Sequence, residues 1–229
     1  MTFSVFLFDL DHTLFDSDAS EALALVATLG GAGVVDAARH LPAYSRINRA
    51  LWDRVERGEL TPHDVRVARF RALVDEAGLV GVDAEVLADA YAAALGDHGD
   101  LYAGAREVLS YVKARARTAL VTNGLSEVQR RRLARTGIED CFDAVDISAE
   151  VGASKPAKAI FEIAFAALQN PKKSEVLMVG DSLSSDMRGG RDFGVTTCWY
   201  NPKRKPRPAD APCDHEIVDL AELRSFVRA

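Results

Sequence analysis

The chain has 229 residues, of which 48% are hydrophobic and 27% charged, as in an ordinary globular protein and unlike a disordered one. Its formal net charge of −6 argues against bulk electrostatic binding of a nucleic-acid polymer, but allows a small anionic substrate in a local site. The widely spaced cysteines and the absence of a signal peptide or a long apolar run predict no disulfide framework, no membrane segment and a cytoplasmic location.

Short apolar segments, taken in chain order, predict a parallel sheet. Each is almost wholly apolar, as expected for a strand buried on both faces: Phe3–Leu7, Thr118–Val121, Val176–Val179 and Val195–Trp199. Helical patterns separate the later strands: Ala105–Arg115, Ser126–Thr136 and Ala157–Leu168. Strands that alternate with helices predict an α/β fold in which helices cover both faces of the sheet.

Residues 17–99 show no strand pattern and interrupt this alternation. Four segments there have helical patterns: Glu21–Leu29, Pro42–Arg57, Asp64–Ala77 and Ala84–Leu95. Gly58 stands where one helix would end, and Thr61 and Pro62 suit the N-cap and first position of the next. We therefore expect a catalytic core of residues 1–16 and 100–229, with an all-helical domain at 17–99.

The first strand is followed by a D-x-D-x-T motif at Asp9, Asp11 and Thr13. Residues two apart on an extended chain point to the same side, so both carboxylates should leave the carboxyl edge of the sheet together. Ligands bind at that edge in open α/β sheets. One carboxylate could act as a nucleophile and the other could transfer a proton. The alternative is a pair of acids that only cap the following turn.

Two further motifs could bind phosphate. The hydroxyl and backbone N–H groups of Thr122, Asn123 and Gly124 follow the second strand, although Asn-Gly is also a common turn sequence. We expect Pro156 to open a helix and to keep Lys155 extended, which would present its ammonium to a phosphoryl group and a carboxylate. Lys155 could otherwise be an ordinary solvated lysine.

A fourth motif places Asp181 and Asp186 after the strand Val176–Val179. Mg²⁺ prefers hard oxygen ligands and keeps several waters, so a few carboxylates suffice to bind it. Asp186 could instead stabilise a helix N-terminus. All four motifs fall at the same end of predicted parallel strands. Together they supply the groups needed for phosphoryl transfer.

These motifs, in this order, resemble those of the haloacid dehalogenase-like hydrolase superfamily. The resemblance implies a Rossmann-like three-layer core with a helical cap inserted after the first motif. It implies that Asp9 is the nucleophile and Asp11 the general acid/base. Dehalogenases of the superfamily lack an aspartate at the position of Asp11 and its phosphatases have one, so the chain looks like a phosphatase.

The resemblance also assigns the remaining roles. Thr122, with Asn123 and Gly124, would bind phosphate, and Lys155 would steady both the phosphate and the nucleophile. The Mg²⁺ ligands would be Asp9, Asp181, Asp186 and the backbone carbonyl of Asp11.

A closer resemblance is to bacterial pyrimidine 5′-nucleotidases. It rests on Val121–Gly124, Arg131–Gly137, Ile147–Lys155, Val176–Asp181 and Cys198–Trp199 in the core, and on Asn48, Leu51, Trp52 and Gly58 in the cap. It implies hydrolysis of pyrimidine nucleoside monophosphates, with UMP, dUMP, dTMP and modified analogues as candidates. We expect a monomer or a homodimer. Phe15 or Trp52 could stack on the base, or both could pack within the cap and its hinge.

Other hypotheses share some of these residues. A sugar-phosphate phosphatase or phosphomutase would have the same catalytic set and a different cap. A receiver-like switch also forms an aspartyl-phosphate, but receivers are usually half this length and lack a capped insert. An interaction module without catalytic activity would not need the complete set of catalytic residues. The basic, proline-rich segment 202–208 is either a solvated connection or an auxiliary contact for phosphate or a partner.

Overall fold

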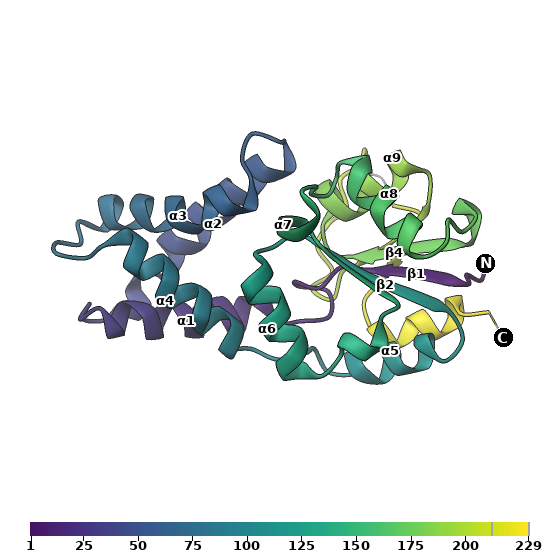
Figure 1. Ribbon diagram of the computed structural model, residues 1–229, viewed down its shortest axis with the longest axis horizontal. Helices are drawn as coiled ribbons and strands as arrows, with labels where there is room; N and C mark the ends of the chain where they lie inside the picture. The colour runs from purple at the N-terminus through teal and green to yellow at the C-terminus, as the bar shows by residue number, and fades with distance from the viewer. Residues whose placement is uncertain (212, 229) are drawn as a thin grey trace.

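The computed structural model, which describes residues 1–211 and 213–228, contains a parallel six-stranded sheet (Figure 1). The strand order is β3-β2-β1-β4-β5-β6, and every neighbouring pair is parallel. The strands are β1 (Val5–Phe8), β2 (Arg117–Thr122), β3 (Ala144–Ile147), β4 (Val176–Gly180), β5 (Thr196–Tyr200) and β6 (His215–Ile217).

The sheet lies between two hydrophobic cores because consecutive side chains of a strand point to opposite faces. In β1, Phe6 and Phe8 pack on one side with α5 (Ala105–Lys113), while Val5 and Leu7 pack on the other with α8 (Lys158–Ala167). This arrangement confirms the predicted Rossmann-like three-layer core.

Several boundaries differ from the prediction. The strands β3 and β6 were not expected, because neither has a long apolar run. Pro156 does not open a helix: it lies in a turn, and α8 begins at Lys158.

The helix α6 occupies Ser126–Thr136, as predicted. The shorter helices are α7 (Ser148–Val151) and α9 (Arg188–Phe193), with a π-helical turn at Leu183–Met187 and 3₁₀ turns at Ala37–His40, Glu139–Cys141, Lys173–Glu175 and Leu220–Phe226.

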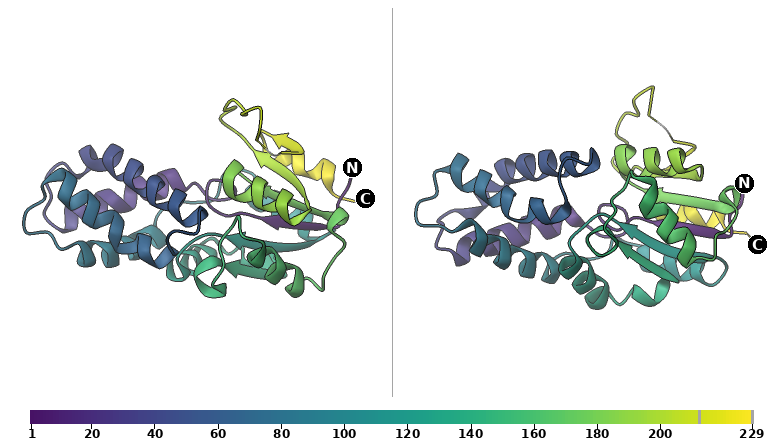
Figure 2. Two further views of the ribbon diagram at one scale, coloured as in Figure 1. Left: turned by 90° about the horizontal axis from the view of Figure 1, so that it is seen from above. Right: turned by 45° about the horizontal axis from the view of Figure 1, so that its top comes forward.

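A second group of helices lies beyond the carboxyl ends of the strands (Figures 1 and 2). These helices are α1 (Ser17–Gly31), α2 (Leu41–Glu56), α3 (Pro62–Ala77) and α4 (Ala84–Asp97). They share their own apolar core, in which Tyr44, Phe70 and Tyr91 are in mutual contact. Thr61 caps α3 through a reciprocal capping box with Asp64. We call α1–α4 the helical insert.

The chain enters and leaves the helical insert through two segments that lie side by side. Phe15 and Leu101 form an antiparallel bridge. The Asp16 N–H donates to the Asp100 carbonyl at 2.9 Å, and the Tyr102 N–H donates to the Leu14 carbonyl at the same distance. The entry segment directly continues the loop that carries Asp9 and Asp11, so the insert is connected to that loop by a short hydrogen-bonded ribbon.

None of the helices in the described part of the chain has the length and apolar character needed to cross a bilayer. Cys141, Cys198 and Cys213, all within the described residues, are free thiols. Of the range 100–229 expected for the core, residues 212 and 229 lie outside the described residues.

Candidate active site

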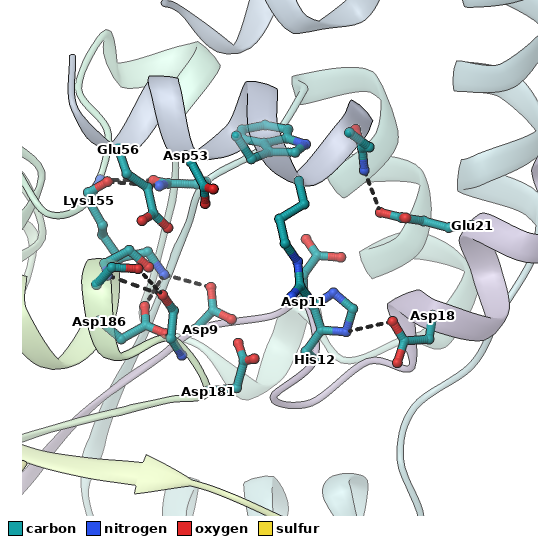
Figure 3. Close-up of a pocket in the computed structure, with 18 of the residues that line it drawn as sticks. Asp9, Asp11, His12, Asp18, Glu21, Asp53, Glu56, Lys155, Asp181 and Asp186 are labelled. Carbon is teal, nitrogen blue, oxygen red and sulfur yellow. Dashed lines mark hydrogen bonds and ion pairs between the residues drawn. The ribbon is translucent and has the colours of Figure 1, made fainter. Parts of the chain in front are cut away.

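The four predicted motifs meet at the carboxyl edge of the three central strands. Phe8 of β1 is in register with Leu120 of β2 and Val179 of β4, so the residues that follow each strand emerge together. They border a cavity of about 800 Å³ between the sheet edge and the helical insert (Figure 3). Its volume is within the range typical of small-molecule sites.

Lys155 lies between two carboxylates at the base of this cavity (Figure 3). Its ammonium donates to Asp9 Oδ1 at 2.6 Å and to Asp186 Oδ1 at 2.7 Å. Only 1% of Lys155 is exposed. Burial alone would lower the pKa of Lys155, but the two carboxylates outweigh burial and raise it. Lys155 therefore stays charged and is not the solvated lysine of the alternative hypothesis.

A third carboxylate, that of Asp181, lies close to the two that contact Lys155. Oxygen atoms of Asp9, Asp181 and Asp186 all lie within 4.8 Å of one another. Burial, followed by the charge of Asp186, raises the pKa of Asp181 to about 7. Burial and the neighbouring acids also raise the pKa of Asp9 despite the opposing effect of Lys155. The excess of negative charge and the hard oxygen ligands fit a divalent cation such as Mg²⁺.

The backbone around Asp186 explains how a carboxylate can be buried there. Asp186 belongs to the π-helical turn, where its Oδ2 accepts from the Ser182 N–H at 3.0 Å. A Cβ on Gly180 would lie 2.2 Å from Asp186 Oδ2, so the glycine leaves the space that this side chain occupies. The indole N–H of Trp199 donates to the Asp181 carbonyl at 2.8 Å and fixes the neighbouring backbone.

The second motif holds Lys155 in place. The Asn123 side chain donates to the Lys155 carbonyl at 2.9 Å and accepts from the Lys155 N–H at 2.8 Å. Asn123 and Gly124 line the cavity, and the Gly124 N–H donates to Ser148 Oγ at 3.0 Å. Thr122 is fully buried and accepts at 3.0 Å from Gln129, which leaves its own hydroxyl proton available for another acceptor.

Asp11 lines the cavity, but its carboxylate is bound by side chains of α6 and α1. It pairs with Arg132 and accepts from Gln129 Nε2 at 2.6 Å and from the Ser17 hydroxyl. Burial alone would raise the pKa of Asp11, but the Arg132 charge and these hydrogen bonds outweigh it and lower the pKa. In this arrangement the Asp11 carboxylate is therefore ionised.

Sequence reasoning did not single out Gln129 or Arg132. A signal was present, because both lie on the buried face of α6 with Val128 and Leu133, and a charged residue at such a position needs a partner. Arg132 also donates to Ser20 Oγ at 3.1 Å, so one buried side chain connects Asp11 to the helical insert.

The two aromatic candidates have different surroundings. Phe15 is fully buried beneath the Arg132 guanidinium, which lies 4.5 Å from the ring centroid, and it packs in the connection to the insert. Trp52 lines the cavity from α2. The segment 202–208 reaches the same site: Lys203 pairs with Asp18 at 2.8 Å, and Lys205 lines the cavity.

Known proteins are similar to this chain over almost its full length. A family model described as haloacid dehalogenase-like hydrolase matches residues 3–194. Pyrimidine 5′-nucleotidase YjjG from Escherichia coli is 33% identical over 220 residues, with 96% of both chains covered. Pyrimidine 5′-nucleotidase PynA from Streptococcus pneumoniae is 33% identical over 97% of this chain and 94% of its own. The magnesium-bound crystal structure of the HAD-hydrolase YfnB from Bacillus subtilis covers 100% of both chains, with a TM-score of 0.91 at 32% identity.

Proposed function

This chain belongs to the haloacid dehalogenase-like hydrolase family, and from that premise we propose that it hydrolyses phosphate monoesters with Asp9 as the nucleophile. The observation that carries the proposal is the position of Lys155, whose ammonium contacts both Asp9 and Asp186 in a buried site. A cation held against a strand-end carboxylate can draw a phosphate dianion toward that carboxylate and offset the repulsion between the two.

The proposed reaction has two steps. An Asp9 carboxylate oxygen attacks phosphorus, the bond to the ester oxygen breaks, and that oxygen leaves as an alcohol with a proton from Asp11. Asp11 then takes a proton from water, whose oxygen attacks phosphorus and releases phosphate and the free Asp9 carboxylate. Thr122 would donate a hydrogen bond to a phosphate oxygen. Asp11 must first pick up a proton, which requires it to separate from Arg132.

The carboxylates of Asp9, Asp181 and Asp186 would hold Mg²⁺, with the Asp11 carbonyl as a further ligand. The bound ion would supply charge neutralisation for the phosphate and for the crowded acids. The magnesium-bound relative from Bacillus subtilis supports this choice of metal. Closure of the helical insert would exclude water from the site.

For the leaving group we propose a pyrimidine nucleoside, with UMP, dUMP and dTMP as substrates. Support comes from two relatives named as pyrimidine 5′-nucleotidases at 33% identity. The cavity of about 800 Å³ is large enough for a nucleotide. We also propose a cytoplasmic location, because three free thiols suit a reducing compartment.

Phosphate release from a panel of nucleotides and sugar phosphates, with and without EDTA, tests this function. We expect turnover of pyrimidine nucleotides that EDTA abolishes and Mg²⁺ restores. Faster turnover of sugar phosphates would favour the broader phosphatase or phosphomutase. Stoichiometric labelling of Asp9 without turnover would favour a receiver-like switch and would contradict the proposal.

A further inference from the structure

The side chain of Glu21 points from α1 into the cavity, on the wall formed by the helical insert (Figure 3). Its Oε1 accepts from Asn48 Nδ2 at 3.1 Å, and this is the one hydrogen bond that the side chain forms with the described residues. Glu21 is half-buried, and its second oxygen, Oε2, is not among the enclosed polar atoms of the described chain that lack a partner. Oε2 is therefore an unused acceptor that is open to the cavity.

Glu21 lies one helical turn beyond the residue that connects α1 to the proposed general acid. The hydroxyl of Ser17, the first residue of α1, donates to the Asp11 carboxylate. Glu21 follows four residues later, on the same face of the helix and about 6 Å farther along its axis. Because Asp11 would protonate the leaving oxygen, Glu21 is placed beside atoms of the leaving group that are a few bonds from that oxygen.

This relationship should persist when the helical insert moves. The helix α1 begins directly after the ribbon in which Phe15 pairs with Leu101, so Glu21 lies in the part of the insert near that ribbon. If the insert turns about the ribbon, the residues closest to it are displaced least. Glu21 should therefore stay near the leaving group when the cavity is open and when it is closed.

The Glu21 carboxylate is suited to a neutral donor such as a hydroxyl group. A carboxylate has about four acceptor sites on its two oxygens, and only one is used here. Burial raises the pKa of Glu21, and a donor from the ligand would stabilise its ionised form. Carboxylates bind sugar hydroxyls in this way at other α/β ligand sites. A second phosphate at this point would instead be repelled.

The sugar of a nucleotide offers a hydroxyl at the required place, since only C5′, C4′ and C3′ separate the leaving oxygen from the 3′-hydroxyl. This hydroxyl is common to UMP, dUMP and dTMP. We propose that Glu21 accepts a hydrogen bond from the 3′-hydroxyl of the nucleotide sugar and thereby selects substrates in which this hydroxyl is free. The inference rests on the proposed nucleotidase function and adds recognition of the sugar.

The test compares kcat/KM of the full chain for dTMP and for its 3′-deoxy analogue, ddTMP, which lacks only the 3′-hydroxyl. In the wild type we expect dTMP to be favoured by about 10- to 100-fold, as for a hydrogen bond to a charged group. In Glu21→Ala this ratio should fall to about one, because the hydroxyl no longer has its acceptor. Glu85→Ala is the matched control and should keep the wild-type ratio, because Glu85 is an exposed glutamate of the insert that pairs with Arg71.

The ratio separates recognition of the sugar from damage to the fold, because a structural defect would lower kcat/KM for both substrates by the same factor. Glu21→Gln provides a second variant. Its amide oxygen can still accept from Asn48, while the loss of charge weakens the bond to a hydroxyl, so we expect an intermediate ratio and a Tm close to that of the wild type. Inhibition by inorganic phosphate should be unchanged in both variants because the catalytic end is intact.

Two results would overturn this inference and leave the nucleotidase function standing. One is an equal kcat/KM for dTMP and ddTMP in the wild type, and the other is a wild-type ratio that persists in Glu21→Ala. A wild type that releases phosphate from ribose 5-phosphate but from no nucleotide would refute the nucleotidase function and this inference together.

Discussion

The carboxylate of Asp11 is paired with the guanidinium of Arg132, a residue 121 positions later in the chain. The same guanidinium group donates to Ser20 of the helical insert. The side chain proposed as general acid is thus bound to an arginine that also contacts the insert. Movement of the insert and release of Asp11 are therefore expected to be coupled.

Replacing Arg132 with Met should destabilise the fold. Arg132 is 3% exposed, and its loss leaves the Asp11 carboxylate without its counter-ion. The Asp11 side chain is 27% exposed, so breaking this half-buried pair should cost about 2 kcal/mol, or about 4–8 °C in Tm for a chain of this size. Arg130→Met is the control, because its pairs with Glu139 and Glu150 are near the surface and worth less than about 1 kcal/mol. Equal Tm values for the two variants would contradict this role of Arg132.

Replacing Asp9 with Asn should abolish turnover and preserve the fold. The amide cannot act as the nucleophile, so kcat should fall by at least about 10⁴-fold. Lys155 retains Asp186 as a partner, so the Tm should stay close to that of the wild type. Steady-state phosphate release and circular dichroism check the two expectations. A near-normal rate in this variant would show that Asp9 is not the nucleophile.

Addition of Mg²⁺ should raise the Tm of the wild type. At a metal concentration 100 times the Kd, binding to the folded state alone adds about 2.7 kcal/mol. Asp181→Asn should reduce this shift without disturbing the Lys155 contacts, which involve Asp9 and Asp186. Asp192→Asn is the control, because Asp192 is exposed on α9 and pairs only at 3.8 Å with Arg188. Differential scanning fluorimetry with a Mg²⁺ titration measures all three proteins, and identical shifts would exclude Asp181 as a ligand.

Asp146 should make stability depend on pH. It is 6% exposed, and its Oδ2 has no partner among the residues described. Burial, assisted by Glu150, raises its pKa from 3.8 to about 6. The folded state binds the Asp146 proton more tightly than the unfolded state does. The contribution of this proton to the free energy of unfolding is therefore complete below pH 3.8 and is lost as pH rises through about 6.

The substitution Asp146→Asn should remove this loss of stability at higher pH. At pH 7.5 we expect the variant to be more stable by about 1 kcal/mol, or about 2–4 °C in Tm. Near pH 4 the two proteins should differ much less, because Asp146 is then protonated and neutral in the folded state, as the asparagine is. Urea unfolding at the two pH values measures the difference. A stability difference that does not change with pH would show that Asp146 does not titrate as expected.

The central strands were predictable from sequence because each is a continuous apolar run, and the motifs that carry the proposed catalytic residues are brought together at one edge of the sheet, as their positions predict. The outer strands were not predictable. β3 has four residues, one of which is a buried aspartate, Asp146, and β6 has only three residues. Their identity as strands depends on pairing with β2 and β5, which local sequence does not encode.

The residues around the catalytic set were harder to find than the set itself. Arg132 stands in a run of three arginines, and only its position on the buried face of α6 separates it from its neighbours. Local sequence likewise does not place Glu21 and Asn48 in one cavity. Their contact depends on how α1 and α2 pack, and hence on tertiary structure.

The paired hydrogen bonds that join Leu14 to Tyr102 and Asp16 to Asp100 hold the two ends of the helical insert close together. A short loop could bridge these ends, so everything between them could in principle be exchanged while the sheet stays whole. Such an arrangement separates two evolutionary problems. The residues at the sheet edge that would break a phosphate ester can stay the same, while changes in the helical insert alter which molecules the cavity binds.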